Sequence, residues 1–224
     1  MLIALPNLDG RESVAAFFRK HFPDVAPLMP GLAREFLEHP VGRMGTVHAD
    51  RWSARGGTAV LLGDAAHAIV PFHGQGMNAC FEDCFELNRL LETTRDWARA
   101  FDEFERVRKP DTDAIAAMAL KNYVEMRDTV RDPKCLLRKE LSFELERRFP
   151  DRFIPRYSMV MFHHEIPYSV AFERGKVQAR ILEDLTATAE SLAQLNPADA
   201  GAAVISRLRP VSARGAGTGQ ALES

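Results

Sequence analysis

Residues 60–84 read VLLGDAAHAIVPFHGQGMNACFEDC, and they carry the strongest structural signal in the chain. The apolar run from Ala59 to Leu62 predicts a buried strand that ends at Gly63-Asp64. Proline and glycine then interrupt any regular pattern, so we expect the backbone to stay irregular until a helix begins near Gln75 or Gly76.

This strand, loop and helix have the chemistry of a cofactor site. The first N–H groups of a helix have no partner within the helix, so they attract anionic oxygens. A carboxylate such as that of Asp64 can accept hydrogen bonds from sugar-like hydroxyls. The alternative is an ordinary strand, loop and helix in which the glycines serve only tight turns. The cofactor interpretation is favoured because a strand-end aspartate, a loop proline and two glycines at a helix start coincide within one short stretch.

The segment from Gly63 to Cys84 resembles the second FAD-binding motif of the single-component FAD-dependent aromatic hydroxylases, and in detail that of the members acting on kynurenine. The resemblance implies that Asp64 binds the ribityl chain of FAD. It also implies that one segment presents backbone amides to the pyrimidine edge of the flavin, namely Gly74, Gln75, Gly76, Met77 and Asn78. A helix N-terminus placed there would stabilise the negative charge of a reduced flavin.

Two later segments, KNYVEMR at 121–127 and FIPRYSMV at 153–160, resemble the helical substrate-site segments of the same family, and IPYS at 166–169 continues the match. The resemblance implies that Asn122 and Tyr157 contact the amino-acid end of L-kynurenine. The remaining residues that it implies are Phe72, His73 and Met126 on the pocket wall near the aromatic ring and ketone, and Pro71 on the loop beside the flavin.

Each of these side chains also has a purely structural interpretation. Asn122 could be a solvated helix residue, and Tyr157 could pack its ring while its hydroxyl meets water. Met126 lies four residues after Asn122, so core packing is as natural as joint lining of a pocket. His73 could be a loop histidine with its hydrogen bonds satisfied, or a hydrogen-bonding group at the ketone.

A complete enzyme of this family needs a strand, a Gly-x-Gly-x-x-Gly fingerprint and a helix for the FAD pyrophosphate. No such fingerprint occurs, because GAGTG at 215–219 follows no strand and precedes no helix. The opening residues 1–9 resemble a mid-sequence substrate-domain strand of the family. We therefore expect the C-terminal portion of a hydroxylase that uses NADPH as co-substrate and is inactive alone. The protein partners that we consider are a missing N-terminal half and a second copy of the chain.

We expect the α/β class, in the form of an α+β remnant: the C-terminal part of the FAD-dependent hydroxylase fold, with a small sheet and a mainly helical subdomain. Four segments are predicted, with residues 1–57 as the sheet remnant, 58–95 as the FAD-binding strand, loop and helix, 96–210 as the helical subdomain and 211–224 as a flexible tail. Helices are predicted at Arg11–His21, Leu32–Leu37, Trp97–Arg106, Pro110–Arg131, Cys135–Arg148, Ser169–Leu195 and Pro197–Leu208, a strand at Leu2–Leu5 and an extended piece at Gly45–Trp52.

Composition narrows the function classes. An apolar content of 46% can build a core, and a net charge of −2 without a long single-sign block gives no case for nucleic-acid binding. No segment approaches the length of a membrane span. The odd number of cysteines, Cys80, Cys84 and Cys135, without secretory features indicates a reducing compartment and hence the cytoplasm. We expect Cys80 and Cys84 to be small buried residues, because no partner completes a zinc site.

Two alternatives stay open beside the kynurenine interpretation. The Gly-Asp motif is shared by hydroxylases of other aromatic acids, and the chain could instead be a non-catalytic helical remnant or interaction module. None of the candidate residues is predicted to act as a nucleophile or a metal ligand, since a flavin would carry the chemistry.

Overall fold

A computed structural model describes residues 8–211 apart from 41, 43, 55, 130 and 131, and the chain divides into two units, Met1–Met44 and Gly45–Ser224. The predicted strand Leu2–Leu5 and the segment 212–224 therefore lie outside the described residues. The division at residue 44 differs from the predicted boundary at 57, and the other predicted boundaries stay predictions. Among the described residues, no helix is both long and apolar enough to cross a membrane.

The first unit contains α1 (Arg11–His21), a short 3-10 turn (Ala26–Leu28) and α2 (Leu32–Glu38). The helices predicted at Arg11–His21 and Leu32–Leu37 are thus confirmed. The Phe18 ring lies 5.6 Å from the Phe22 ring and 5.8 Å from the Phe36 ring, so aromatic contacts join the two helices.

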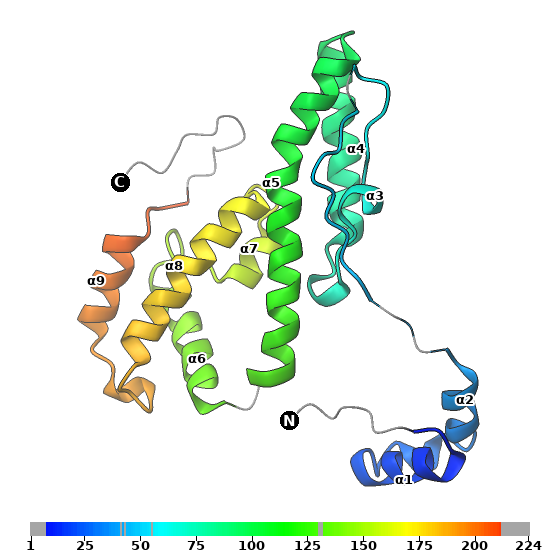
Figure 1. Cartoon of the computed structure of the whole chain (residues 1–224). Helices are drawn as coiled ribbons and strands as arrows, with labels where there is room; N and C mark the ends of the chain where they lie inside the picture. Colours follow the sequence, from blue (N-terminus) through cyan, green and yellow to red (C-terminus); the bar gives the residue numbers. More distant parts are fainter. Residues whose placement is uncertain (1–7, 41, 43, 55, 130–131, 212–224) are drawn as a thin grey trace. The chain divides into compact units, whose positions relative to one another are not determined.

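The second unit is mainly helical (Figure 1). Its helices are α3 (Asp64–His67), α4 (Gly76–Thr93), α5 (Trp97–Val124), α6 (Pro133–Arg148), α7 (Arg156–Phe162), α8 (Tyr168–Thr186) and α9 (Pro197–Arg207). Short 3-10 turns occupy Pro71–His73 and Leu192–Gln194, and a π-helical turn, Glu125–Thr129, follows α5. The long α5 packs against α4 on one side and α8 on the other, so it links the predicted flavin segment to the helical subdomain.

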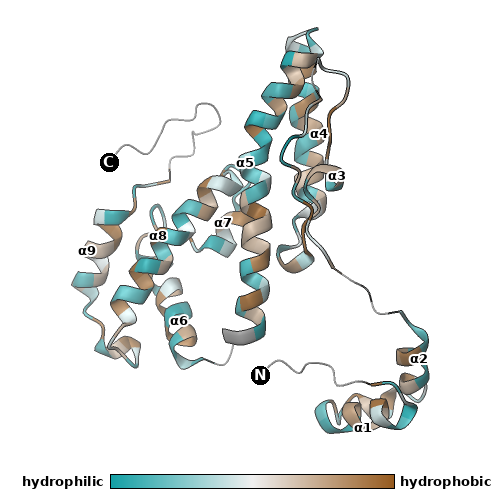
Figure 2. Ribbon diagram, in the orientation of Figure 1, coloured by the Kyte–Doolittle hydropathy of each residue, from teal (hydrophilic) through white to brown (hydrophobic). Residues whose placement is uncertain are grey.

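Hydrophobic residues at helical spacing build the core around α5. Ile115 and Met118 of α5 pack with Met159 of α7 and Ala171 of α8, and all four side chains are fully buried. Figure 2 shows this concentration of hydrophobic residues along α5. A second cluster joins α6, α8 and α9, and a third, which includes Trp52, lies between the extended segment, α4 and α5.

The predicted sheet is represented in the described residues by one isolated antiparallel bridge between Ser53 and Val60. Neighbouring backbone bonds extend this pairing, because Leu61 N–H donates to Trp52 O at 2.8 Å and Ala49 N–H donates to Ala66 O at 3.1 Å. The segment 45–53 thus runs extended beside 59–68, while the small sheet of the α/β class stays a prediction.

Three of the predicted helices have other bounds in the structure. The predicted helices Trp97–Arg106 and Pro110–Arg131 form one helix, α5, which continues through Pro110 to Val124. Proline removes one backbone hydrogen bond, but buried side chains on both sides of it hold the helix in place. The predicted helix Ser169–Leu195 ends earlier, as α8 at Thr186, because the Lys134 ammonium of α6 binds the carbonyl oxygens of Thr186, Ala187 and Ala189.

Candidate flavin and substrate site

The start of α4 offers three free backbone donors. Gln75 precedes the helix, and its carbonyl accepts the first helical bond from Ala79 N–H at 2.9 Å. No side chain caps this end, and within the described part of the chain no acceptor meets the N–H groups of Gly76, Met77 and Asn78. Because Gly74 adopts a left-handed conformation at φ 65°, the chain turns sharply just before the helix. These residues fit an electron-rich edge such as that of a flavin pyrimidine ring.

Asp64 has an exposed side chain that contacts α4 at Cys80. It is the first residue of α3, and the preceding Gly63 has φ 59° and ψ −138°. A Cβ at Gly63 would come within 3.0 Å of the Cys80 sulfur, so glycine is required here by both backbone conformation and space. The Cys80 thiol lies 3.8 Å from an Asp64 carboxylate oxygen. Burial and then the negative charge of Asp64 raise the pKa of Cys80.

A buried charge network fixes the Asp64 turn against α4 and α5. The fully buried Asp83 carboxylate lies 2.5 Å from His67 Nε2 and accepts hydrogen bonds from Arg108 Nε at 2.8 Å and Gly63 N–H at 3.2 Å. Burial opposes ionisation of Asp83, but hydrogen bonds from His67 and Arg108 outweigh it and lower the pKa of this carboxyl. Arg108 also contacts Glu82 at 2.9 Å. The network ties the Gly63–His67 turn to α4 at Asp83.

Sequence reasoning missed this network. The sequence pattern that could have indicated the network is a charged residue on an apolar helix face. Arg108 lies four residues after buried Phe104, and Asp83 lies four residues after buried Ala79. Such residues are seldom buried unless they are paired, but the partners come from three elements and no local spacing identifies them.

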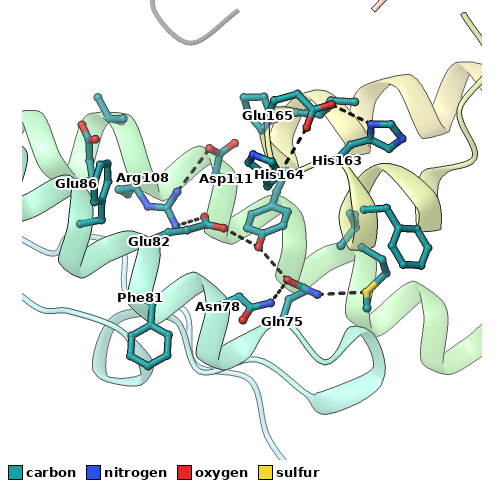
Figure 3. A pocket seen from close by; sticks show the side chains of 18 residues that line it. Gln75, Asn78, Phe81, Glu82, Glu86, Arg108, Asp111, His163, His164 and Glu165 are labelled. Atoms are coloured by element: carbon teal, nitrogen blue, oxygen red, sulfur yellow. Dashed lines mark hydrogen bonds and ion pairs between the residues drawn. The ribbon is translucent and has the colours of Figure 1, made fainter. Parts of the chain in front are cut away.

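The side chain of Gln75 is buried, and that of the exposed Asn78 is hydrogen-bonded to it. Gln75 Oε1 accepts hydrogen bonds from Asn78 Nδ2 at 2.8 Å and from the Tyr168 hydroxyl at 3.1 Å, as Figure 3 shows. Glu82 Oε1 lies 2.9 Å from the same hydroxyl, so the single Tyr168 proton is shared between the two acceptors. Burial, followed by the negative charge of Glu82, raises the pKa of Tyr168. These bonds orient the first turn of α4 while its N–H groups stay free.

The structure brings most of the predicted substrate residues together. Asn122 Nδ2 donates to the Phe72 carbonyl at 2.6 Å and lies 3.8 Å from the Met126 sulfur. The Phe72 ring packs on Tyr123, with ring centroids 4.6 Å apart. Asn122 is therefore more than a solvated helix residue, since it ties the loop before α4 to the end of α5. Pro71, which begins the 3-10 turn, is exposed.

His73 and Tyr157 form the other side of this group. Their rings are stacked with centroids 5.7 Å apart and an interplanar angle of 26°. His73 is buried, and neither ring nitrogen has a hydrogen-bond partner among the residues that the structure describes. Burial and then the positive charge of Arg156 lower the pKa of His73 to about 4. The imidazole is consequently neutral near pH 7 and can donate or accept one hydrogen bond. More than half of the Tyr157 side chain is exposed, as is that of Met126.

A cavity of about 740 Å³ lies on another face, between α4, α5 and the segment that joins α7 to α8 (Figure 3). It shares Gln75 and Asn78 with the predicted flavin segment, but the five residues Phe72, His73, Asn122, Met126 and Tyr157 do not line it. The predicted substrate residues therefore form a group separate from this cavity.

The cysteine prediction requires correction. Cys84 is exposed and Cys80 is only half-buried. Both lie on the face of α4 that also carries Met77, Phe81 and Phe85. These three side chains are exposed, so the described residues leave much of this face uncovered.

Comparison with known proteins agrees with the geometry. Residues 31–117 match the model of a family described as FAD binding domain. Kynurenine 3-monooxygenase of Stenotrophomonas maltophilia (strain K279a) is 46% identical over 86% of this chain and 46% of its own length. The corresponding protein of Xanthomonas euvesicatoria pv. vesicatoria (strain 85-10) is 46% identical over 94% of this chain and 50% of its own. That of Myxococcus xanthus (strain DK1622) is 43% identical over 93% and 44%.

The chain thus spans about half the length of the curated relatives that it matches. Identity of 43–46% over most of the chain, together with the family match, extends the resemblance well beyond the segment 63–84. Over most of its length the chain is therefore similar to about half of the length of these kynurenine 3-monooxygenases, and it contains a match to an FAD binding domain.

Proposed function

We propose that the chain is part of an FAD-dependent monooxygenase that hydroxylates the aromatic ring of L-kynurenine with NADPH and dioxygen. The observation that carries the proposal is the start of α4, where three N–H groups are free and the exposed Asp64 carboxylate lies 3.8 Å from the thiol of Cys80, in the same helix. The names of the relatives support kynurenine as the substrate. Because the chain spans half of their length, activity requires the remaining half, in the same or a separate polypeptide.

Bound FAD would supply the activation of dioxygen. The chain's own residues would bind and orient. The amides of Gly76, Met77 and Asn78 would stabilise negative charge at the pyrimidine edge, and Asp64 would accept hydrogen bonds from the ribityl hydroxyls. This division of roles needs no nucleophile from the protein.

The substrate would lie against the stacked rings of His73 and Tyr157. Neutral His73 can donate a hydrogen bond to the ketone without placing a charge in the pocket. Asn122 keeps its carbonyl oxygen available, because its Nδ2 is occupied by the Phe72 carbonyl, so the amide can accept a hydrogen bond from the substrate ammonium. The three free cysteines are consistent with a cytoplasmic protein.

The test uses the chain joined to the remaining half of the Stenotrophomonas maltophilia relative. Asn122→Ala should weaken kynurenine binding at least tenfold and leave FAD binding within a factor of about two, because Asn122 lies on the substrate side. Titration calorimetry gives both affinities, and Asn88→Ala, at an exposed asparagine of α4, is the matched control. Equal loss of both ligands, or binding of another aromatic acid in preference to kynurenine, would contradict the substrate assignment.

A further inference from the structure

An ion pair joins the end of α5 to the start of α7. Arg156 Nη2 lies 3.2 Å and 3.1 Å from the two carboxylate oxygens of Glu125. Glu125 opens the π-helical turn that follows α5, and Arg156 is the first residue of α7. π-Helical turns are uncommon and often occur at functional sites. The pair therefore connects two elements that carry candidate substrate residues.

Arg156 occupies a position that stability alone would not select. Its Nε is buried without an acceptor among the described residues, and its side chain is only 17% exposed. A cation at the N-terminus of α7 is also unfavourable with respect to the helix dipole. The aliphatic part of Arg156 crosses Gly175 of α8, where a Cβ would come within 2.8 Å of Arg156 Cδ. Gly175 thus leaves space for an arginine whose burial is energetically unfavourable, which indicates a function other than packing.

The neighbours of the pair suggest that function. Tyr157 follows Arg156 directly and stacks on His73, while Met126 follows Glu125 directly and lies next to Asn122. The ion pair consequently sets the position of the His73 and Tyr157 rings relative to the end of α5. Met159 anchors α7 in the core, so the ion pair bears on the first turn of α7, where the exposed Tyr157 lies.

We propose that Arg156 is a positioning residue for the candidate substrate site: held by Glu125 and seated over Gly175, it keeps Tyr157 stacked on His73 and a positive charge beside the imidazole. That these rings face kynurenine rests on the proposed function. The stacking and the charge are properties of the chain itself, so they are tested without substrate.

The experiment is an NMR pH titration of the His73 ring in the purified chain. The charged groups that face His73 are Arg156, which lowers its pKa, and Glu125, which raises it. In the wild type we expect a pKa of about 4 and contacts between the His73 and Tyr157 rings. Arg156→Met should raise the pKa by about one unit and weaken the ring contacts, because a charge and its anchor are lost together.

Arg156→Lys keeps the charge and should keep the pKa low, which separates positioning from packing and serves if Arg156→Met does not fold. The control Arg106→Met removes an exposed arginine of α5 and should leave the pKa of His73 unchanged. A wild-type His73 that titrates near its ordinary value, or an unchanged pKa in folded Arg156→Met, would overturn the inference. If the shift occurs but the joined protein binds no kynurenine, the proposed function fails and the positioning role stands.

Discussion

At the residue scale, the buried Asp83 carboxylate holds the Asp64 turn in place. Truncation by Asp83→Ala leaves the buried His67 ring nitrogen without its acceptor and removes the buried partner of Arg108, which keeps only Glu82 and Asp111 as ion-pair partners. Removing one member of a buried ion pair costs about 3–5 kcal/mol, so we expect the unfolding free energy to fall by about 3 kcal/mol. Urea denaturation measures the change, and Asp151→Ala, at an exposed aspartate, is the control. A loss below about 1 kcal/mol would show that the network does not hold the turn.

His73 should make stability depend on pH. Its pKa is about 4 in the folded chain and 6.5 ordinarily, so the unfolded chain takes up a proton first as pH falls. Above pH 6.5, His73 therefore makes its full contribution to the unfolding free energy. Between pH 6.5 and pH 4 the unfolding free energy falls by about 3 kcal/mol. His73→Gln should flatten the curve of unfolding free energy over this window, whereas His164→Gln, at a side chain that is 99% exposed, should not. A wild type with constant stability across the window would contradict the assignment.

At the element scale, the sequence predicted the helix starts that are capped by a side chain next to them in the chain. α6 begins where Asp132 accepts a hydrogen bond from Lys134 N–H, and α9 begins where Asn196 accepts one from Ala198 N–H. Both starts were predicted to within two residues. The end of α8 was not, because its carbonyls are bound by Lys134, which lies 52 residues away from Thr186. The same limit hid the Asp83 network, whose contacts join residues 16 and 25 positions apart.

The continuous α5 gives a prediction at this scale. Pro110 lies inside the helix and is exposed, so Pro110→Ala restores a backbone donor without disturbing the core. We expect the unfolding free energy to rise by about 1–3 kcal/mol. Pro197→Ala, in the first turn of α9 where no donor is needed, should change it by less than about 0.5 kcal/mol. Equal effects of the two substitutions would contradict an unbroken α5.

At the scale of the whole molecule, α4 has an exposed apolar face. Met77, Phe81 and Phe85 are 68%, 64% and 72% exposed along one face that begins at the candidate flavin site. Exposed apolar patches of this kind favour association. The double substitution Phe81→Ser with Phe85→Ser should therefore reduce self-association in light scattering and leave thermal unfolding of the chain nearly unchanged. If the double variant still associates at the same protein concentration, the surface responsible for self-association is not this face of α4.

The same reasoning predicts weak or absent FAD binding by the chain alone. The residues of α3 and α4 offer contacts for the flavin end, and no Gly-x-Gly-x-x-Gly fingerprint is available for the pyrophosphate. Joining the remaining half of a relative should raise FAD affinity by at least a hundredfold in fluorescence titration. Tight binding by the chain alone would contradict this expectation. The sequence indicated Asp64 and the start of α4, but only the packed structure shows that the Gln75 side chain is buried against Tyr168.

The most direct test is a crystal structure of the joined protein with FAD bound. We predict the pyrimidine edge of the flavin at the N–H groups of Gly76, Met77 and Asn78, with the ribityl hydroxyls at the Asp64 carboxylate. A flavin bound elsewhere, or an Asp64 side chain directed away from the ribityl chain, would contradict the account.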